Sequence, residues 1–135
     1  MKSFMLVAAL LVIGQAQETF KTRLSPVPID GTMRASVTGK GSATATLAGD
    51  TVSITGSFEG LQAAATVARL HQSKVAGVRG PVLADLTVSK AVSGTVSGSI
   101  KLTSEQADSL RKGRLYIQIH SEKAPDGNLW GWLLR

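Results

Sequence analysis

The stretch Ala43–Phe58, ATATLAGDTVSITGSF, decides the fold. In its second half, apolar residues such as Ile54 and Phe58 alternate with Ser and Thr, so an extended chain has one apolar face and one hydroxyl-bearing face. The first half alternates Ala and Thr in the same way, and Gly49-Asp50 between the halves is typical of a tight turn. The stretch therefore predicts a β-hairpin.

The same alternation continues along the chain, with Gly and Pro between the segments. Further strands are predicted at Phe20–Leu24, Arg34–Thr38, Thr66–His71, Val82–Val88, residues 96–102, Leu115–His120 and Asn128–Leu134. Gly98 inside one of these segments indicates a bulge or a closely approaching neighbour. Many short strands with this punctuation predict an all-β protein, a two-sheet antiparallel β-sandwich.

One segment departs from the alternation and predicts a short helix near residues 104–112. Thr103-Ser-Glu-Gln106 is a capping box, in which Thr103 is the N-cap and Gln106 reaches back to it. Arg111 and Lys112 suit the negative end of the helix dipole, and Gly113 suits a left-handed residue after the helix. The helix explains the basic cluster of Arg111, Lys112 and Arg114 without a ligand.

Composition narrows the class of protein. A chain of 135 residues is expected to form one domain, and with only six aromatic residues its core must consist mainly of Val, Ile, Leu and Ala. The absence of Cys excludes disulfides, thiolate metal sites and cysteine nucleophiles. The net charge of +6 is spread along the chain and not interleaved with aromatic residues, so it predicts a solvated basic surface and no specific nucleic-acid binding.

Residues 1–16, MKSFMLVAALLVIGQA, are typical of an export signal. Lys2 supplies the positive start, Phe4–Ile13 is too short an apolar run to span a bilayer, and Gly14 and Ala16 suit a cleavage site. We expect cleavage after Ala16, a single domain over residues 17–135, and no later membrane span. The alternative is a retained membrane anchor. An exported chain without Cys suggests a bacterial protein in the periplasm or outside the cell.

The last two predicted strands define a candidate binding face. If Leu115, Ile117 and Ile119 face the core together with Leu129 and Leu133, the simplest register pairs His120 with Asn128, Gln118 with Trp130 and Tyr116 with Trp132. The other face of this hairpin then carries a stripe of Tyr116, Gln118, Trp130 and Trp132. An exposed stripe would suit a partner protein, a second copy of the chain or a glycan. Alternatively, the predicted helix or the N-terminal segment covers it as a second small core.

His71, His120 and Asp126 form a candidate metal site. Two imidazoles and a carboxylate are a minimal ligand set for Zn or Cu, although Arg69 would oppose a cation there. Alternatively, both histidines donate to backbone carbonyls and hold loops. No paired carboxylates, nucleophile elbow or phosphate-binding loop are evident, so the sequence predicts no catalytic residues and a protein that is not an enzyme.

Several short motifs together resemble the CHRD domain, a module repeated in chordin and found singly in bacterial exported proteins. They are Phe58-Glu-Gly-Leu61, Ala68-Arg-Leu-His71, Gly80-Pro-Val82, Leu102-Thr-Ser-Glu-Gln106, Gly113-Arg-Leu-Tyr-Ile-Gln-Ile-His120 and Pro125-Asp-Gly127 followed by Gly131. The resemblance implies an immunoglobulin-like or superoxide-dismutase-like Greek-key sandwich. Where the family pattern has His, Glu and Arg, this chain has Arg69, Asn128 and Trp130. We therefore expect an exported, non-enzymatic binding or structural module.

Overall fold

The structure is a computed structural model that describes residues 16–28 and 31–135, so residues 1–15 of the predicted export signal lie outside the described residues. The strands are β1 (Gln17–Pro26), β2 (Lys40–Ala48), β3 (Thr51–Glu59), β4 (Ala65–Gln72), β5 (Val82–Val88), β6 (Gly94–Lys101), β7 (Leu115–Ser121) and β8 (Leu129–Trp132). The helices are a 3₁₀ helix, η1 (Gly31–Ser36), and an α-helix, α2 (Ser104–Arg111).

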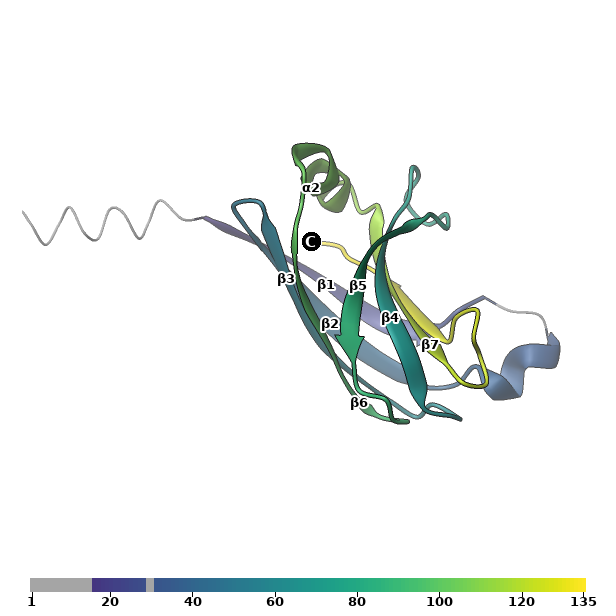
Figure 1. Ribbon diagram of the computed structural model, residues 1–135. Coiled ribbons are helices and arrows are strands. Elements are labelled where there is room, and N and C mark those ends of the chain that lie inside the picture. The colour runs from purple at the N-terminus through teal and green to yellow at the C-terminus, as the bar shows by residue number, and fades with distance from the viewer. Residues whose placement is uncertain (1–15, 29–30) are drawn as a thin grey trace, which may run out of the picture.

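The strands form one closed antiparallel barrel in the order β1-β2-β3-β6-β5-β4-β7-β8 (Figure 1). The all-β prediction is confirmed, but the predicted two-sheet sandwich is wrong. Two strands change partners along their length and close the sheet. β1 pairs with β2 as far as Leu24 and then with β8 through Ser25 and Pro26. β5 pairs with β4 through Leu86 and then with β6 through Thr87 and Val88.

The predicted hairpin at Ala43–Phe58 is confirmed as β2 and β3. Ala48 lies opposite Thr51, and Gly49 turns the chain with a φ of 63°, a conformation in which a Cβ is unfavourable. Ile54 and Phe58 face the core, whereas Ser53 and Thr55 face solvent. The alternation in the sequence therefore separates the inside of the barrel from the outside.

The predicted strand at Arg34–Thr38 is wrong, because η1 occupies most of that segment. Arg34 and Ala35 are exposed, and of the five residues only Val37 is buried. A segment this short gains little stability from an extended conformation when no neighbouring strand pairs with it. Instead, the Asn128 side chain donates a 2.8 Å hydrogen bond to the carbonyl of Thr38 and holds the end of the segment.

Aliphatic side chains fill the barrel, and Phe20 and Phe58 are the two aromatic residues in this main core. Gly131 lies on the inner face of β8, where a Cβ would be 2.6 Å from the carbonyl oxygen of Arg23. This close approach lets β1 cross β8 and close the barrel. Gly98 on β6 has a close neighbour, as predicted: a Cβ there would be 2.6 Å from a methyl group of Leu86.

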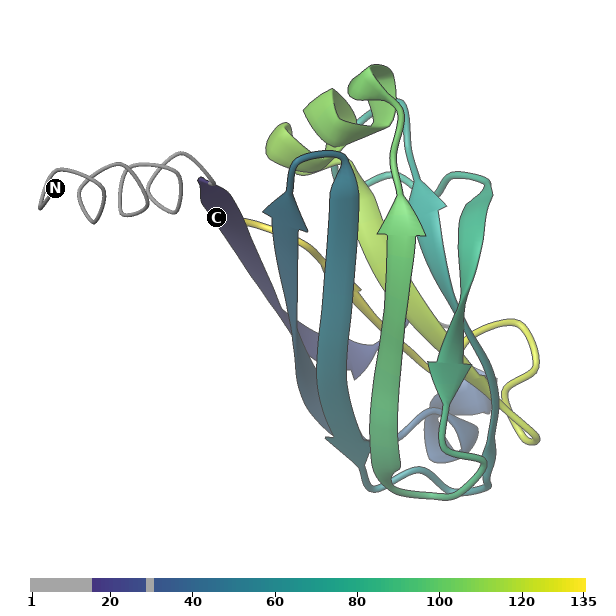
Figure 2. The same cartoon turned by 60° about the vertical axis from the view of Figure 1, so that its left-hand side comes forward.

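The predicted helix is confirmed, and α2 covers one end of the barrel between β6 and β7 (Figure 2). The hydroxyl of Thr103 accepts a hydrogen bond from the backbone N–H of Gln106, and the Gln106 side chain accepts one from the N–H of Thr103. Leu110 is buried, and Arg111 forms an ion pair of 2.9 Å with Glu18 on β1. No helix in the described part of the chain is long and apolar enough to cross a membrane.

Candidate functional site

The predicted pairing of the C-terminal hairpin is confirmed. Tyr116 lies opposite Trp132 and Gln118 opposite Trp130. Because Ile117 points inward from β7, these four side chains share the outer face of the barrel. The face continues onto β4, where His71 lies opposite Tyr116 and Arg69 opposite Gln118. We call the outer surface formed by Tyr116, Gln118, Trp130, Trp132 and His71 the aromatic face.

Four rings of the aromatic face are in contact. The Tyr116 ring centroid is 4.5 Å from that of Trp132 and 5.6 Å from that of Trp130, and the two Trp centroids are 5.7 Å apart. His71 stacks on Tyr116 with centroids 4.6 Å apart and an interplanar angle of 12°. Tyr116 is therefore the centre of the cluster and is only 1% exposed, while both Trp side chains are half-buried.

The loop between β4 and β5, residues 73–81, covers Tyr116. The Tyr116 hydroxyl accepts a hydrogen bond from the N–H of Gly80 and donates one to the carbonyl of Gly80, each 3.1 Å long. Arg79 places its guanidinium 5.1 Å from the centre of the Trp130 ring and donates a 3.3 Å hydrogen bond to Gln118. Arg79 cannot be recognised as part of this face from the sequence, because nothing in the local pattern indicates where the loop folds.

The N-terminal segment covers part of Trp130. Val27, Val37 and Ala124 are buried in a small cluster of their own, against which Trp130 packs. The two sequence-based alternatives, an exposed stripe or a second small core, are therefore both partly realised. Tyr116 and Gln118 belong to the buried layer, and the two Trp rings form the accessible layer above it.

The His71 side chain is buried, and its surroundings favour the neutral imidazole over the charged one. Its Nδ1 lies 3.0 Å from the carbonyl oxygen of Gly80, which can only accept, so Nδ1 carries the proton and Nε2 has a free lone pair. Burial lowers the pKa of His71 below its usual 6.5; the Gly80 hydrogen bond opposes this shift, and electrostatic interactions with His120, Arg69 and Arg79 add to it. The Nε2 atom is buried and has no hydrogen-bond partner within the described structure.

His120 is held in the same way by a different loop. Its Nδ1 donates to the carbonyl of Pro125 over 2.8 Å, and its Nε2 accepts a hydrogen bond from Gln118 over 3.2 Å. The Gln118 side chain also donates to the backbone carbonyl of Asp126 over 3.4 Å. Gln118 thereby links the hairpin loop to Arg79 on the neighbouring loop.

The structure does not gather His71, His120 and Asp126 into one metal site. His71 lies opposite Tyr116 and His120 opposite Val67, so their backbone positions are roughly 14 Å apart at about 3.4 Å per residue. Asp126 contributes its backbone carbonyl rather than its carboxylate to this network. Among the residues that the structure describes, no three His, Cys, Asp or Glu side chains lie close enough to hold a metal ion together.

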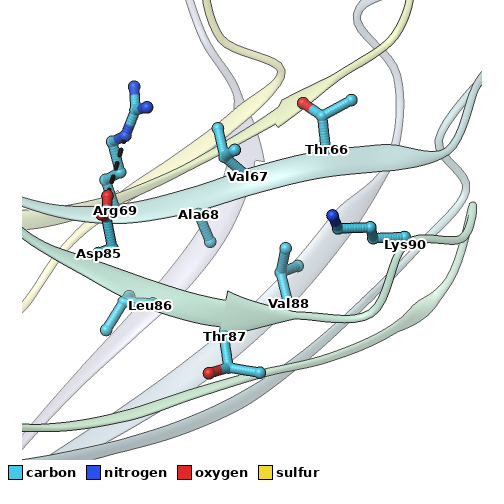
Figure 3. Close-up of a pocket in the computed structure, with 9 residues that line it drawn as sticks. All are labelled: Thr66, Val67, Ala68, Arg69, Asp85, Leu86, Thr87, Val88 and Lys90. Carbon is cyan, nitrogen blue, oxygen red and sulfur yellow. Dashed lines mark hydrogen bonds and ion pairs between the residues drawn. The ribbon is translucent and has the colours of Figure 1, made fainter.

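A separate groove of about 340 Å³ lies where β4 and β5 part (Figure 3). Arg69 and Asp85 form a 3.2 Å ion pair at one end, and Lys90 lies at the other. Both partners of the ion pair are substantially exposed. Apolar residues such as Val67 and Val88 line the middle of the groove, which is open to solvent. Neither tryptophan belongs to its lining.

The fold and the aromatic face define a class: a small antiparallel β-barrel whose interior is filled by side chains, leaving the outer surface and loops for recognition. The comparisons with known proteins then identify the family. The family model for the CHRD domain matches residues 20–133, so this chain belongs to the CHRD domain family. The expected resemblance is confirmed. No curated protein and no solved structure matches the chain.

Two departures from the family pattern have structural consequences. Asn128, in place of Glu, is fully buried; it accepts a 2.7 Å hydrogen bond from Ser121 and donates to Thr38. Trp130, which stands where the family pattern has Arg, lies against the guanidinium of Arg79 from the neighbouring loop. Asn128 therefore anchors the N-terminal segment, and Trp130 and Arg79 together give this face its aromatic and cationic character.

Proposed function

We propose that this chain is an exported, non-enzymatic binding module that contacts a partner protein through its aromatic face. The observation that carries the proposal is the pair of half-buried indole rings, Trp130 and Trp132, packed over the buried Tyr116 ring. Trp, Tyr and Arg supply most of the binding energy in protein interfaces, and Arg79 lies over the Trp130 ring. The buried layer below holds the indoles in place before a partner arrives, which reduces the entropy cost of binding.

The ring geometry favours a protein over a glycan. A sugar ring stacks best on a flat and unoccupied aromatic face. Here the indoles meet at 67° and the Arg79 guanidinium already lies over the Trp130 ring. Two rings at this angle offer no common flat surface for a sugar, whereas a partner's side chains can contact a ring face and a ring edge at once.

Export is the second part of the proposal. Cleavage after Ala16 would leave Gln17 as the first residue, and β1 begins at Gln17, so every strand of the barrel would remain after cleavage. N-terminal sequencing of the protein from the periplasm and the medium is expected to begin at or within a few residues of Gln17. Protein that keeps residues 1–16 and pellets with membranes would support the alternative of a retained anchor.

Binding of Zn or Cu is the second candidate function, and one observation favours it. His71 donates Nδ1–H to the Gly80 carbonyl and keeps a buried Nε2 without a hydrogen-bond partner in the described structure, which is how metal-ligating histidines are commonly oriented. Metal titration of the untagged protein, compared with His71→Ala, tests this candidate. Bound metal below about a tenth of an equivalent at micromolar supply would end it.

Accessibility of the indoles is the first requirement of the partner-binding proposal. Trp130→Phe and Trp132→Phe each leave one tryptophan, whose fluorescence reports its own surroundings. We expect both emissions to be red-shifted and quenched by acrylamide, because both side chains are half-buried. Blue-shifted emission that acrylamide does not quench would remove the aromatic face as an interface.

Occupancy of the face is tested by photo-crosslinking in the exported fraction of cells that make the protein. A photoreactive residue at position 132 is expected to give an adduct of defined mass. The matched control places the same residue at Ser53, which is exposed on β3 and away from the aromatic face, and is expected to give none. An adduct of twice the chain mass would assign the face to a homodimer, and equal labelling at both positions would contradict the proposal.

A further inference from the structure

Most of the exposed large apolar side chains gather at the end of the barrel that α2 covers, here called the α2 end. Among the described residues these exposed side chains are Val75, Val78, Val82, Val92 and Leu134. Val75 and Val78 lie in the β4–β5 loop, 58% and 56% exposed, and Val82 begins β5 directly after it. Leu134 contacts Gly113, directly beyond α2. Only Val92 lies at the opposite end, between β5 and β6.

Three cations share this end with the apolar residues. Lys74 precedes Val75 in the loop, and Lys112 and Arg114 follow α2. The loop and the end of the helix are adjacent, because the N–H of Ser73 donates a 2.8 Å hydrogen bond to the carbonyl of Arg114. Gln72 also donates to Ser109 of α2 over 2.9 Å.

The acidic groups at the α2 end are mostly engaged elsewhere. Glu18 pairs with Arg111 and Arg135, Asp108 pairs with Arg111, and Asp50 pairs with Lys101. Within the described chain, none of the ion pairs involves Lys74, Lys112 or Arg114. Glu105, another acidic residue of α2, lies in the first turn of the helix and therefore at the end far from these cations. The cations next to the valines are therefore free to contact an external anion.

Hydrogen bonds fix the β4–β5 loop in a conformation that leaves Val75 and Val78 exposed. The Ser73 hydroxyl donates to the carbonyl of Val75 over 2.6 Å and accepts from the N–H of the same residue over 3.1 Å. The N–H of Val78 closes a turn onto the carbonyl of Val75 over 3.1 Å. At the other end of the loop, Gly80 is fixed to the buried Tyr116. The exposure of both valines is thus a feature of a fixed loop.

We propose that the α2 end is a docking surface for an anionic lipid bilayer. Valine side chains would enter the interfacial region while Lys74, Lys112 and Arg114 contact anionic headgroups, the combination that peripheral membrane proteins use.

A lipid surface fits these residues better than a soluble polyanion does. A polyanion would use the cations and leave Val75 and Val78 exposed, whereas a bilayer uses both. The proposal does not depend on the aromatic face, because it involves neither Trp130 nor Trp132. Failure of one proposal therefore leaves the other intact.

Vesicle binding of the chain from Gln17 onward tests the docking surface. This chain contains every strand and the whole described core, and it lacks the apolar run that would itself partition into lipid. We expect flotation with phosphatidylcholine vesicles that contain phosphatidylglycerol and little flotation with phosphatidylcholine alone. Val75→Ser combined with Val78→Ser should weaken partitioning about tenfold. The triple variant Lys74→Gln, Lys112→Gln, Arg114→Gln should weaken it about a hundredfold.

Matched controls at the opposite end separate docking from general charge. Val92→Ser removes one exposed valine at that end, and the triple variant Lys40→Gln, Lys90→Gln, Lys123→Gln removes three exposed cations there. Both controls should keep at least half of the wild-type partitioning. No binding by the wild-type chain, equal loss in the control triple variant, or no loss when the two valines are replaced would each overturn the proposal. Circular dichroism melting verifies that every variant is folded.

Discussion

His71 makes the stability of this barrel depend on pH in a definite direction. The folded state lowers the pKa of His71 mainly by burial, so between that pKa and the usual 6.5 the unfolded chain binds more protons than the folded chain. The free energy of unfolding should therefore fall as the pH is lowered through about 6.5 and stay level above it. Glu18 acts in a lower range, because its own pKa is lowered from 4.5 by the hydrogen bond from Arg111.

Urea unfolding at about pH 7.5 and about pH 5.5 measures this effect. The wild-type midpoint should fall on acidification, and that of His71→Gln should fall less, because the variant lacks the group that must stay neutral. The comparison concerns the change with pH, so the loss of the Tyr116 stack in the variant does not enter it. Equal changes in the two proteins would contradict the assignment to His71.

Single side chains also show what the sequence could predict about the candidate site. Alternation along a strand is a local property, so it placed Tyr116, Gln118, Trp130 and Trp132 on one face correctly. It could not place Arg79 or Gly80, because the conformation of the β4–β5 loop depends on contacts with Tyr116 and Gln118 that are distant in sequence. The separation of His71 and His120 was not predictable for the same reason, since the register between β4 and β7 sets it.

Contact between β1 and β8 closes the barrel, and Gly131 permits it. A Cβ at Gly131 would lie within 2.6 Å of the backbone oxygen of Arg23, which cannot rotate away. We expect Gly131→Ala to lower the free energy of unfolding by about 2–3 kcal/mol, as overpacking does. Gly98→Ala is the matched control and should cost under about 1 kcal/mol, because its nearest neighbour is a methyl group of Leu86 that can turn aside.

Urea unfolding of both glycine variants checks this prediction. If Gly131→Ala and Gly98→Ala lowered the free energy of unfolding equally, the close approach of the β1 and β8 backbones would not be what makes Gly131 necessary. A smaller m-value for Gly131→Ala with an unchanged midpoint would instead indicate that β8 is already detached in the native state.

Whole elements were predictable where the signal is local. The β2–β3 hairpin follows from the alternating pattern and Gly49-Asp50, and α2 follows from the reciprocal hydrogen bonds of Thr103 and Gln106. The segment at Arg34–Thr38 has an alternating pattern too, but no strand pairs with it, and η1 forms in its place. An alternating pattern therefore predicts a strand reliably only where a neighbouring strand can pair with the segment.

The arrangement of the strands as a barrel could not be predicted in this way. A sandwich and a filled barrel require the same inward and outward alternation along each strand, so the pattern cannot distinguish them. A barrel differs from a sandwich in that the edge strands of the two sheets pair with each other. In this protein only two short stretches of strand make those pairings. Ser25 and Pro26 join β1 to β8, and Thr87 and Val88 join β5 to β6. None of these four residues carries a pairing signal of its own.

The same short junctions predict how the molecule opens. β3 pairs along its length with β2 and with β6, whereas β5 pairs with β6 only at Thr87 and Val88 and leaves β4 near the groove. Local opening should therefore begin at β5 rather than at β3, because fewer paired positions hold β5 in the barrel. In native-state hydrogen exchange, amides of β5 should exchange at least about tenfold faster than those of β3. Exchange that is equally slow in both strands would mean that the barrel opens only by global unfolding.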